Sequence, residues 1–354
     1  MSRHNFGARI DQFTRDGHQT VVLENETIRI ELLPGKGSDI VQFVYKPSDS
    51  DFMLRTTRGL RPRSEMVLSP GLDAVSMIDF YEGGWQECLP NGGPASVYRG
   101  AVVPFHGELW NASWDVEVTI DTPEVVGIRL TARTARSPYH LSKTLTLRSG
   151  RSVLEIDESL SNESDLEMQL MWGHHPSFGP PFLDASCRID LPSAMCSTAR
   201  SAPMPSSRLR FGADFAWPLA PLAAGGEVDL SIIPPITTRA SEWVCLSGFE
   251  SGWYGITNRQ KQVGFGLRWN ADLFRYLWFW QEWGGGTDYP WYGRNYNCAL
   301  EPWTSWPDSG LAEAITNGSA LTILPRQTIQ TRLLAVAYAE RTGIAGITED
   351  GEVL

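Results

Sequence analysis

The residues best suited to proton transfer stand together in segment 172–177, which reads Trp-Gly-His-His-Pro-Ser. Histidine is the side chain whose ordinary pKa lies nearest neutrality, so it can donate or accept a proton there. Pro176 disfavours helical backbone at His175 and pushes that residue towards an extended conformation. Because residues 166–172 are mostly apolar and strand-like, we expect His175 at the end of a strand, oriented by the proline. The alternative is a turn whose imidazoles bind only backbone groups.

Two further side chains could share this chemistry. His106 stands in a Pro-Phe-His-Gly run, and Glu301 ends an apolar segment directly before Pro302, as His175 does before Pro176. A carboxylate and an imidazole that face one substrate can act as general base and general acid, each contributing roughly 10²–10⁴-fold. His175, Glu301 and His106 are therefore the candidate catalytic residues.

Residues 83–93 form a stretch with glycines at both ends, which allows close approach of backbone to a ligand. The stretch offers an aromatic ring, amide groups and a carboxylate, which are typical of a binding loop. The alternative is a glycine-rich hairpin corner that binds nothing. Its candidate ligand-binding residues are Trp85, Gln86, Glu87 and Asn91.

The sequence does not favour a metal site. Adjacent residues of an extended chain point to opposite faces, so His174 and His175 are poorly placed to bind one ion together with His106 and Glu301. The five cysteines include no C-x-x-C spacing, which argues against a zinc site or a disulfide framework. We expect neither a metal nor a cofactor. The cysteines are Cys88, Cys187, Cys196, Cys245 and Cys298.

Composition limits the partners. The chain has 354 residues and a net charge of −11, which supplies no counterion-release term for nucleic acid or for an anionic membrane surface. No apolar run approaches membrane-spanning length, and the first residues lack an apolar signal core, so we expect a cytoplasmic protein. Its 14 tryptophans suit a sugar site or a sandwich core, and most of them are expected in the core.

The elements that must hold these residues are strands. Apolar and polar residues alternate through 116–120, 126–132 and 154–156, and short turn segments separate successive strands. No helix-length stretch has sustained 3.6-residue periodicity. We therefore expect an all-β protein of mainly antiparallel strands folded as a sandwich. The expected division is a loose lead-in over 1–19, one β-sandwich domain over 20–340 and a polar tail over 341–354; residues 193–226 are expected as long loops.

The motifs in this order resemble the aldose 1-epimerase (mutarotase) superfamily. They are Gly-Gly-Trp-Gln-Glu-x-x-Pro-Asn, His-Gly-x-x-Trp, Gly-His-His-Pro-x-Phe-Gly and Leu-Glu-Pro-Trp, and the similarity extends from about Thr20 to Tyr338. The chain looks like the divergent bacterial members of that superfamily. The resemblance implies a galactose mutarotase-like β-supersandwich that binds a free sugar in a cleft, without a cofactor.

The resemblance also implies roles for individual residues. His175, in a His-x-x-Phe context, matches the general acid; Glu301 matches the general base, and His106 matches a second histidine in a His-Gly context. Ser177 stands where galactose enzymes commonly have tyrosine. The sugar-binding arginine has no secure match among Arg61, Arg63 and Arg99, and the sugar-binding aspartate is unplaced.

On this basis we expect an isomerase that interconverts the α and β anomers of a free sugar. Glu301 would take the proton from O1, His175 would protonate the ring oxygen, and His106 would hydrogen-bond the ring oxygen or a neighbouring hydroxyl. The protein would act as a monomer or homodimer on a small-molecule sugar, with no nucleic acid or membrane partner. Further residues expected to bind the sugar are His174, Trp172, Trp280, Gln281 and Glu282.

Two other functions fit the same residues. A non-catalytic carbohydrate-binding protein would use the aromatic and amide groups but needs no acid–base pair. A glycosidase usually needs two carboxylates, and Glu87, Glu282 and Glu301 leave that function, or a polysaccharide lyase, open.

Overall fold

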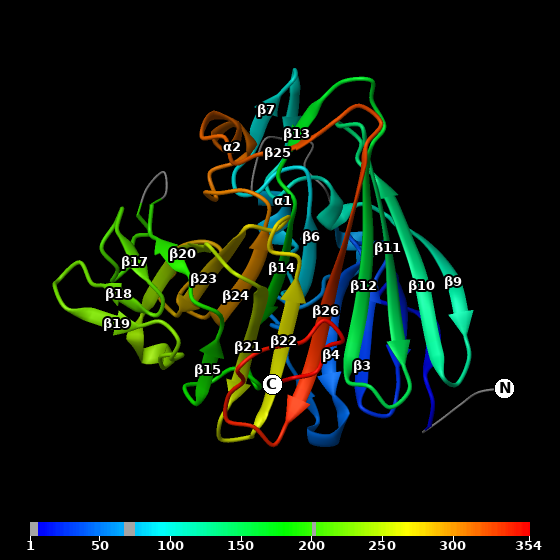
Figure 1. The fold of residues 1–354 in the computed structure, drawn as a ribbon, viewed down its shortest axis with the longest axis horizontal. Helices are drawn as coiled ribbons and strands as arrows, with labels where there is room; N and C mark the ends of the chain where they lie inside the picture. The colour runs from blue at the N-terminus through cyan, green and yellow to red at the C-terminus, as the bar shows by residue number, and fades with distance from the viewer. Residues whose placement is uncertain (1–5, 67–74, 200–202) are drawn as a thin grey trace.

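Strands of the computed structural model, which describes residues 6–66, 75–199 and 203–354, form two large antiparallel sheets lying face to face (Figure 1). The first sheet has 12 strands, and most of the candidate site residues lie on its central strands. Its strands in spatial order are β1 (Arg9–Arg15), β2 (His18–Glu24), β3 (Ile28–Leu33), β4 (Asp39–Tyr45), β6 (Trp85–Cys88), β14 (Gly173–Phe178), β24 (Tyr296–Trp303), β23 (Tyr276–Trp283), β20 (Ala240–Ser247), β16 (Met195–Ser197) and β17 (Asp214–Ala216), with β5 (Ser50–Asp51) beside β4.

The second sheet has 8 strands and covers one face of the first. Its longest strand, β26, lies between β22 and β12, so the chain returns to the centre of the sheet near its end. The strands in spatial order are β15 (Cys187–Asp190), β21 (Gly252–Asn258), β22 (Val263–Trp269), β26 (Thr328–Ala339), β12 (Val153–Asn162), β11 (Tyr139–Arg148), β10 (Val125–Arg133) and β9 (Asp115–Asp121).

Aromatic side chains from both sheets interlock in the space between them. Phe43 of β4 packs edge to face on Phe265 of β22, with ring centroids 5.2 Å apart, and Phe178 of β14 lies 5.1 Å from the same ring. Such pairs add about 0.5–1.5 kcal/mol each beyond the area they bury. This core explains the alternation predicted from the sequence, because every second side chain of a strand points into it.

Short elements decorate the ends of the sandwich. The described residues include two helices, α1 (Val75–Asp79) and α2 (Leu311–Thr316), which in Figure 1 lie near the upper end of the strands. Three two-stranded sheets pair β7 (Ser96–Tyr98) with β8 (Ala101–Val103), β13 (Met168–Leu170) with β25 (Leu321–Ile323), and β18 (Leu219–Pro221) with β19 (Glu227–Asp229). Single 3₁₀ turns span η1 (Lys46–Ser48), η2 (Arg63–Glu65), η3 (Leu109–Asn111) and η4 (Ile236–Thr238).

Several expectations about local structure need correction. Residues 9–15, expected in a loose lead-in, form β1, which pairs with β2 along its whole length. The tail is also ordered in part, since Ile347 is buried and pairs with Val353. Residues 193–226 contain the short strands β16, β17 and β18 between loops. These segments lack a long apolar alternation because each buries few side chains.

Two corrections concern the motifs themselves. Residues 85–88, expected in an irregular loop, are the central strand β6, paired with β14 on one side. His175 does not end a strand at 166–172; it lies inside the next strand, β14, directly before Pro176. Pro176 fits within β14 because proline and the residue before it both favour extended backbone.

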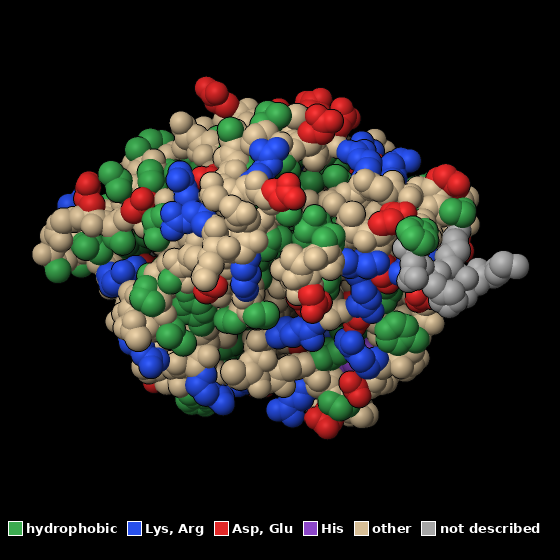
Figure 2. Space-filling model, turned by 90° about the horizontal axis from the view of Figure 1, so that it is seen from below, with side chains coloured by type: hydrophobic (Ala, Val, Ile, Leu, Met, Phe, Trp, Pro, Cys, Tyr) green, Lys and Arg blue, Asp and Glu red, His purple; other side chains and the backbone are tan. Residues whose placement is uncertain are grey.

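No helix in the described residues is both long and apolar enough to cross a bilayer. On the face seen in Figure 2, basic side chains are interspersed with acidic ones.

Candidate active site

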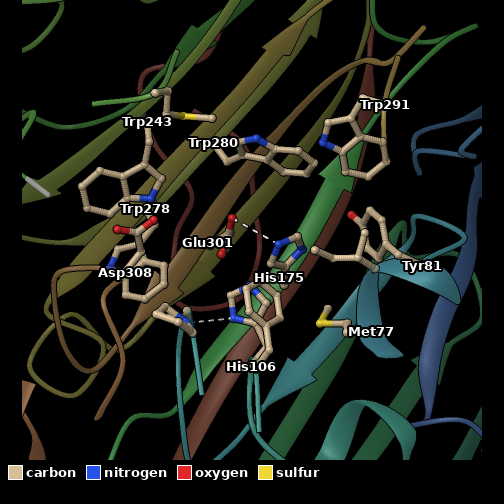
Figure 3. Close-up of a pocket in the computed structure, with 15 residues that line it drawn as sticks. Met77, Tyr81, His106, His175, Trp243, Trp278, Trp280, Trp291, Glu301 and Asp308 are labelled. Carbon is tan, nitrogen blue, oxygen red and sulfur yellow. Dashed lines mark hydrogen bonds and ion pairs between the residues drawn. The ribbon is translucent and has the colours of Figure 1, made fainter. Parts of the chain in front are cut away.

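A cavity of about 250 Å³ opens on the face of the first sheet that points away from the second sheet. Its floor is made by β14, β24 and β23, and its walls come from β20 and from loops (Figure 3). Pockets for drug-sized ligands are commonly about 300–1,000 Å³, so this smaller cavity suits a ligand smaller than a typical drug. The lining residues are Met77, Ile78, Tyr81, Gly93, Pro94, Phe105, His106, His175, Met204, Trp243, Trp278, Trp280, Trp291, Glu301 and Asp308.

His175 and Glu301 meet at the floor of the cavity. They come from the neighbouring strands β14 and β24, and Nε2 of His175 lies 3.4 Å from Oε1 of Glu301. Both side chains are buried, with 6% and 2% of their surfaces exposed. The other oxygen of Glu301, Oε2, accepts a hydrogen bond of 2.9 Å from the Trp303 indole N–H, which fixes the carboxyl group in place.

A chain of hydroxyl groups reaches the opposite nitrogen of the same imidazole. Ser177 lies two residues after His175 in β14, so both point to the cavity face. The Ser177 hydroxyl lies 3.2 Å from Nδ1 of His175, and the Tyr81 hydroxyl lies 2.6 Å from that of Ser177. Tyr81, Ser177, His175 and Glu301 are thus joined in one sequence of hydrogen-bonding groups.

His106 forms the wall beside this pair. Its φ of 52° places it in the left-handed region, and the following Gly107 has a φ of 81°. A side chain on Gly107 would have its Cβ 2.2 Å from the Leu89 carbonyl oxygen, which explains why the motif is His-Gly. The Gly93 N–H donates a 3.1 Å hydrogen bond to Nδ1 of His106. A neutral His106 therefore carries its proton on Nε2 and can donate it.

Burial sets the charge of all three groups. It raises the pKa of Glu301 well above its ordinary value and lowers the pKa of His175 to about 4. The pKa of His106 lies well below its ordinary value, because of burial and then of the nearby His175. The contact between His175 and Glu301 could be an ion pair, but these shifts favour the uncharged form. The proton then sits on the Glu301 carboxyl.

The predicted residues on the other face of the same strands do not line the cavity. His174 points into the sandwich, where its Nε2 lies 3.1 Å from Glu158 of β12 and its Nδ1 accepts a 3.3 Å hydrogen bond from the Trp85 indole. Glu87 receives the Trp172 indole N–H at 2.8 Å. Direct sugar contact, predicted for His174, Trp85, Glu87 and Trp172, does not fit this geometry.

This inner group is a buried polar network. Glu87, Glu158 and His174 bring ligand-type atoms within 4.8 Å of one another, but the Lys143 ammonium lies 3.0 Å from Glu87 and 4.6 Å from the centre of the Trp114 ring. An ammonium beside the carboxylate supplies the positive charge that a metal would bring. Burial raises the pKa of Glu158 to about 7, with the Glu87 carboxylate as the next cause.

The other four predicted residues do not line the cavity, and two of them, Asn91 and Glu282, hold loops that do. Asn91 donates to the Pro94 and Pro104 carbonyl groups at 2.8 and 2.9 Å, and so holds the loop that carries His106. Gln86 donates to the Gly83 carbonyl at 2.6 Å. Glu282 accepts the Gly286 N–H at 2.7 Å and anchors the loop to Trp291; Gln281 is buried on the opposite face of β23.

Of the residues predicted to bind sugar, Trp280 lines the cavity, and the structure adds several that the sequence did not single out. Trp278 shares the face of Trp280 because it lies two residues earlier in β23, and Trp243 pairs with Trp280 across strands. Strand alternation could have identified Trp278. Tyr81, Trp291 and Asp308 come from loops, for which the sequence gives no comparable signal. Figure 3 shows the aromatic rings around His175 and Glu301.

The two stacked antiparallel sheets have the galactose mutarotase-like fold. The structure matches a protein from Klebsiella pneumoniae subsp. pneumoniae that carries a provisional assignment as an aldose 1-epimerase, with a TM-score of 0.68, 14% identity, and coverage of 93% of this chain and 83% of that one. A galactose mutarotase-like protein from Clostridium acetobutylicum matches with a TM-score of 0.61, 14% identity, and coverage of 94% and 99%. A galactose mutarotase related enzyme from Lactobacillus acidophilus gives a TM-score of 0.58, 14% identity, and coverage of 92% and 100%.

The chain belongs to a family known as Domain of unknown function (DUF4432), whose model matches residues 15–207. None of the proteins with curated descriptions matches its sequence. The predicted all-β, mutarotase-like fold is confirmed by these structures.

Proposed function

We propose that this protein is an aldose 1-epimerase, which interconverts the α and β anomers of a free sugar. The observation that carries the proposal is the contact of 3.4 Å between His175 Nε2 and Glu301 Oε1 at the floor of a small cavity. Anomer exchange needs one group that takes the proton from O1 and one that gives a proton to the ring oxygen, and no cofactor.

The pair can supply both transfers in one cycle. Glu301 as carboxylate accepts the O1 proton while His175 as imidazolium protonates the ring oxygen, and the C1–O5 bond breaks to give an aldehyde. Rotation about C1–C2 presents the other face of the aldehyde. O5 then attacks C1, His175 takes the proton back from O5, and the Glu301 carboxyl returns its proton to the new O1. Protons and electron pairs balance over the cycle.

The uncharged pair favoured by burial is the state that this cycle reaches after ring opening. It differs from the charged pair only by one proton moved between Glu301 and His175, which face each other directly. A sugar hydroxyl bound to the carboxylate would favour the charged form, because hydrogen bonds to a charged group stabilise it. His106, which presents Nε2–H, would hydrogen-bond the ring oxygen or a neighbouring hydroxyl.

The test is exchange between anomers, measured by NMR magnetisation transfer or polarimetry over a panel of free sugars. His175→Asn and Glu301→Gln should each abolish the catalysed exchange while circular dichroism and the melting temperature show a retained fold. Full activity in either variant would remove that residue from its role. Binding of sugars with no exchange by the wild-type protein would favour the non-catalytic carbohydrate-binding function.

A second function is favoured by one observation. Asp308 lines the same cavity as Glu301, which gives two carboxyl groups, the set that most glycosidases use. Release of nitrophenol from a panel of nitrophenyl glycosides, lost in Asp308→Asn, would support hydrolysis. No release, together with anomer exchange of free sugars, would support the epimerase.

A further inference from the structure

The walls of the cavity are strongly aromatic. Trp243, Trp278, Trp280 and Trp291 surround it, together with Tyr81, Phe105, Met77 and Met204. The rings of Trp280 and Trp291 lie 5.7 Å apart, and that of Tyr81 lies 6.2 Å from Trp291, so these three form one continuous wall. Aromatic faces accept C–H and methyl groups well but give hydroxyl groups little to bind.

The polar side-chain groups in the cavity are few, and most of them are engaged; the indole N–H groups of Trp280 and Trp291 are two further donors. His175, Glu301 and His106 are taken up by O1 and the ring oxygen in the proposed reaction. The Tyr81 hydroxyl binds Ser177, and the indole N–H of Trp278 donates to the Ser305 carbonyl at 3.1 Å. Asp308 is the one further carboxylate among the described lining residues. A hexose has four more hydroxyl groups, and burying a hydroxyl without a hydrogen-bond partner is unfavourable.

The cavity also offers no counter-charge for an anion. The described lining residues include two carboxyl groups and no lysine or arginine. Burial keeps both histidines neutral near pH 7, since the pKa of His175 is about 4 and that of His106 lies well below its ordinary value. A phosphate, sulfonate or uronate group would enter without a cation to pair with, which is costly in a buried site.

We propose that the sugar is uncharged and has fewer hydroxyl groups than a hexose, such as a 6-deoxyhexose, whose methyl group lies against the aromatic wall of Tyr81, Trp280 and Trp291. This substrate class rests on the proposed epimerase function. It goes beyond that function because it follows from the wall and not from the acid–base pair.

Matched sugar pairs that differ in one oxygen test the inference on the full chain. They are D-fucose with D-galactose, 6-deoxy-D-glucose with D-glucose, and L-rhamnose with L-mannose, with D-glucose 6-phosphate added as an anionic member. In the preferred pair, we expect kcat/KM for exchange to be at least about 10-fold higher for the deoxy sugar, which corresponds to about 1.4 kcal/mol for one unpaired hydroxyl. The phosphate should be exchanged at least about 100-fold more slowly than glucose. Equal or faster exchange of the parent hexose in every pair, or efficient exchange of the phosphate, would overturn the inference and leave the epimerase standing.

Binding provides a readout that does not need catalysis. The tryptophans of the wall should report sugar binding through quenched fluorescence, in wild-type protein and in His175→Asn. If the deoxy sugar binds at least 10-fold more tightly than its parent but no sugar is exchanged, the epimerase is overturned, and the deoxy sugar is a ligand of the cavity and not a substrate. If none of the sugars binds, both fail.

A pair of variants tests the wall itself. Trp291→Ala removes most of one ring and should reduce the preference for the deoxy sugar at least about 5-fold, while Trp291→Phe keeps an aromatic face and should retain most of it. An unchanged ratio between deoxy sugar and hexose in Trp291→Ala would show that the wall does not select the methyl group.

Discussion

The hydroxyl of Ser177 lies 3.2 Å from Nδ1 of His175, on the side of the ring opposite Glu301. This contact orients the imidazole in both protonation states of the pair. When Glu301 holds the proton and donates to Nε2, Nδ1–H donates to the Ser177 hydroxyl; when Glu301 has given its proton to Nε2, the imidazolium still carries Nδ1–H and donates it to Ser177. The Ser177 hydroxyl accepts in both states and stabilises the imidazolium.

Ser177→Ala should therefore lower kcat for anomer exchange roughly 10-fold or more, with a small effect on KM, since a buried hydrogen bond to a charged group is worth about 1.5–3 kcal/mol. Ser177→Thr keeps the hydroxyl and should recover most of the loss. Steady-state exchange kinetics measure both. An equal loss in the two variants would show that packing, and not the hydroxyl, is required.

Tyr81→Phe tests the Tyr81 hydroxyl, which contacts the Ser177 hydroxyl. It removes the 2.6 Å contact with Ser177 but keeps the ring in the cavity wall. The expected result is a loss in kcat smaller than that of Ser177→Ala, because Ser177 can still bind His175, together with an unchanged preference among sugars. A changed sugar preference in Tyr81→Phe would assign the hydroxyl to substrate binding instead.

The pH profile of kcat/KM should reflect the pair and not a free histidine. With the pKa of Glu301 raised and that of His175 at about 4, the pair holds one proton from about pH 4 upward, until Glu301 ionises. The rate should fall as pH drops through about 4, where His175 gains the second proton, and fall again in alkali, where Glu301 loses its own. Above about pH 5 the profile should be flat until Glu301 ionises, measured against the rate with His175→Asn as background. A rate that rises with pH through about 6.5, the ordinary pKa of histidine, would contradict this assignment.

Gly173→Ala should disturb the site indirectly. A Cβ on Gly173 would lie 2.2 Å from the Trp303 ring, whose indole N–H binds Glu301 and whose face stacks 5.8 Å from His106. We expect a loss of roughly 1–3 kcal/mol of stability from overpacking, and lower kcat. Gly35→Ala is the control, because a Cβ there meets nothing within 4 Å. Urea unfolding and exchange kinetics give the two readouts, and wild-type values for Gly173→Ala would refute the role of Trp303.

The inner network should matter for stability and little for chemistry. Lys143→Met leaves Glu87 buried beside Glu158 without its ammonium partner, and breaking a buried ion pair costs about 3–5 kcal/mol. Lys143→Met combined with Glu87→Gln removes both charges and should recover much of the loss. Urea unfolding measures this, and similar stability of the two variants would show that the pair contributes no coupling.

The sequence by itself predicted the class of fold and the residues that are proposed to react. Alternation through 126–132 and 154–156 predicted strands that the structure contains, and the adjacency of His174 and His175 predicted that only one of them faces any given site. These are local properties, since an extended chain turns each successive side chain to the opposite face whatever surrounds it.

Only the tertiary structure decided which face became the site. Trp85 and Glu87 look like a binding motif, yet β6 turns them towards the second sheet, where Glu87 pairs with Lys143. Tyr81 and Asp308 line the cavity from loops that are far apart in the chain. Loops have no periodic sequence pattern from which this position could have been predicted. The protonation states of His175 and Glu301 could not be predicted from the sequence either. A pKa depends on burial and on neighbouring groups, and only the folded structure brings these together.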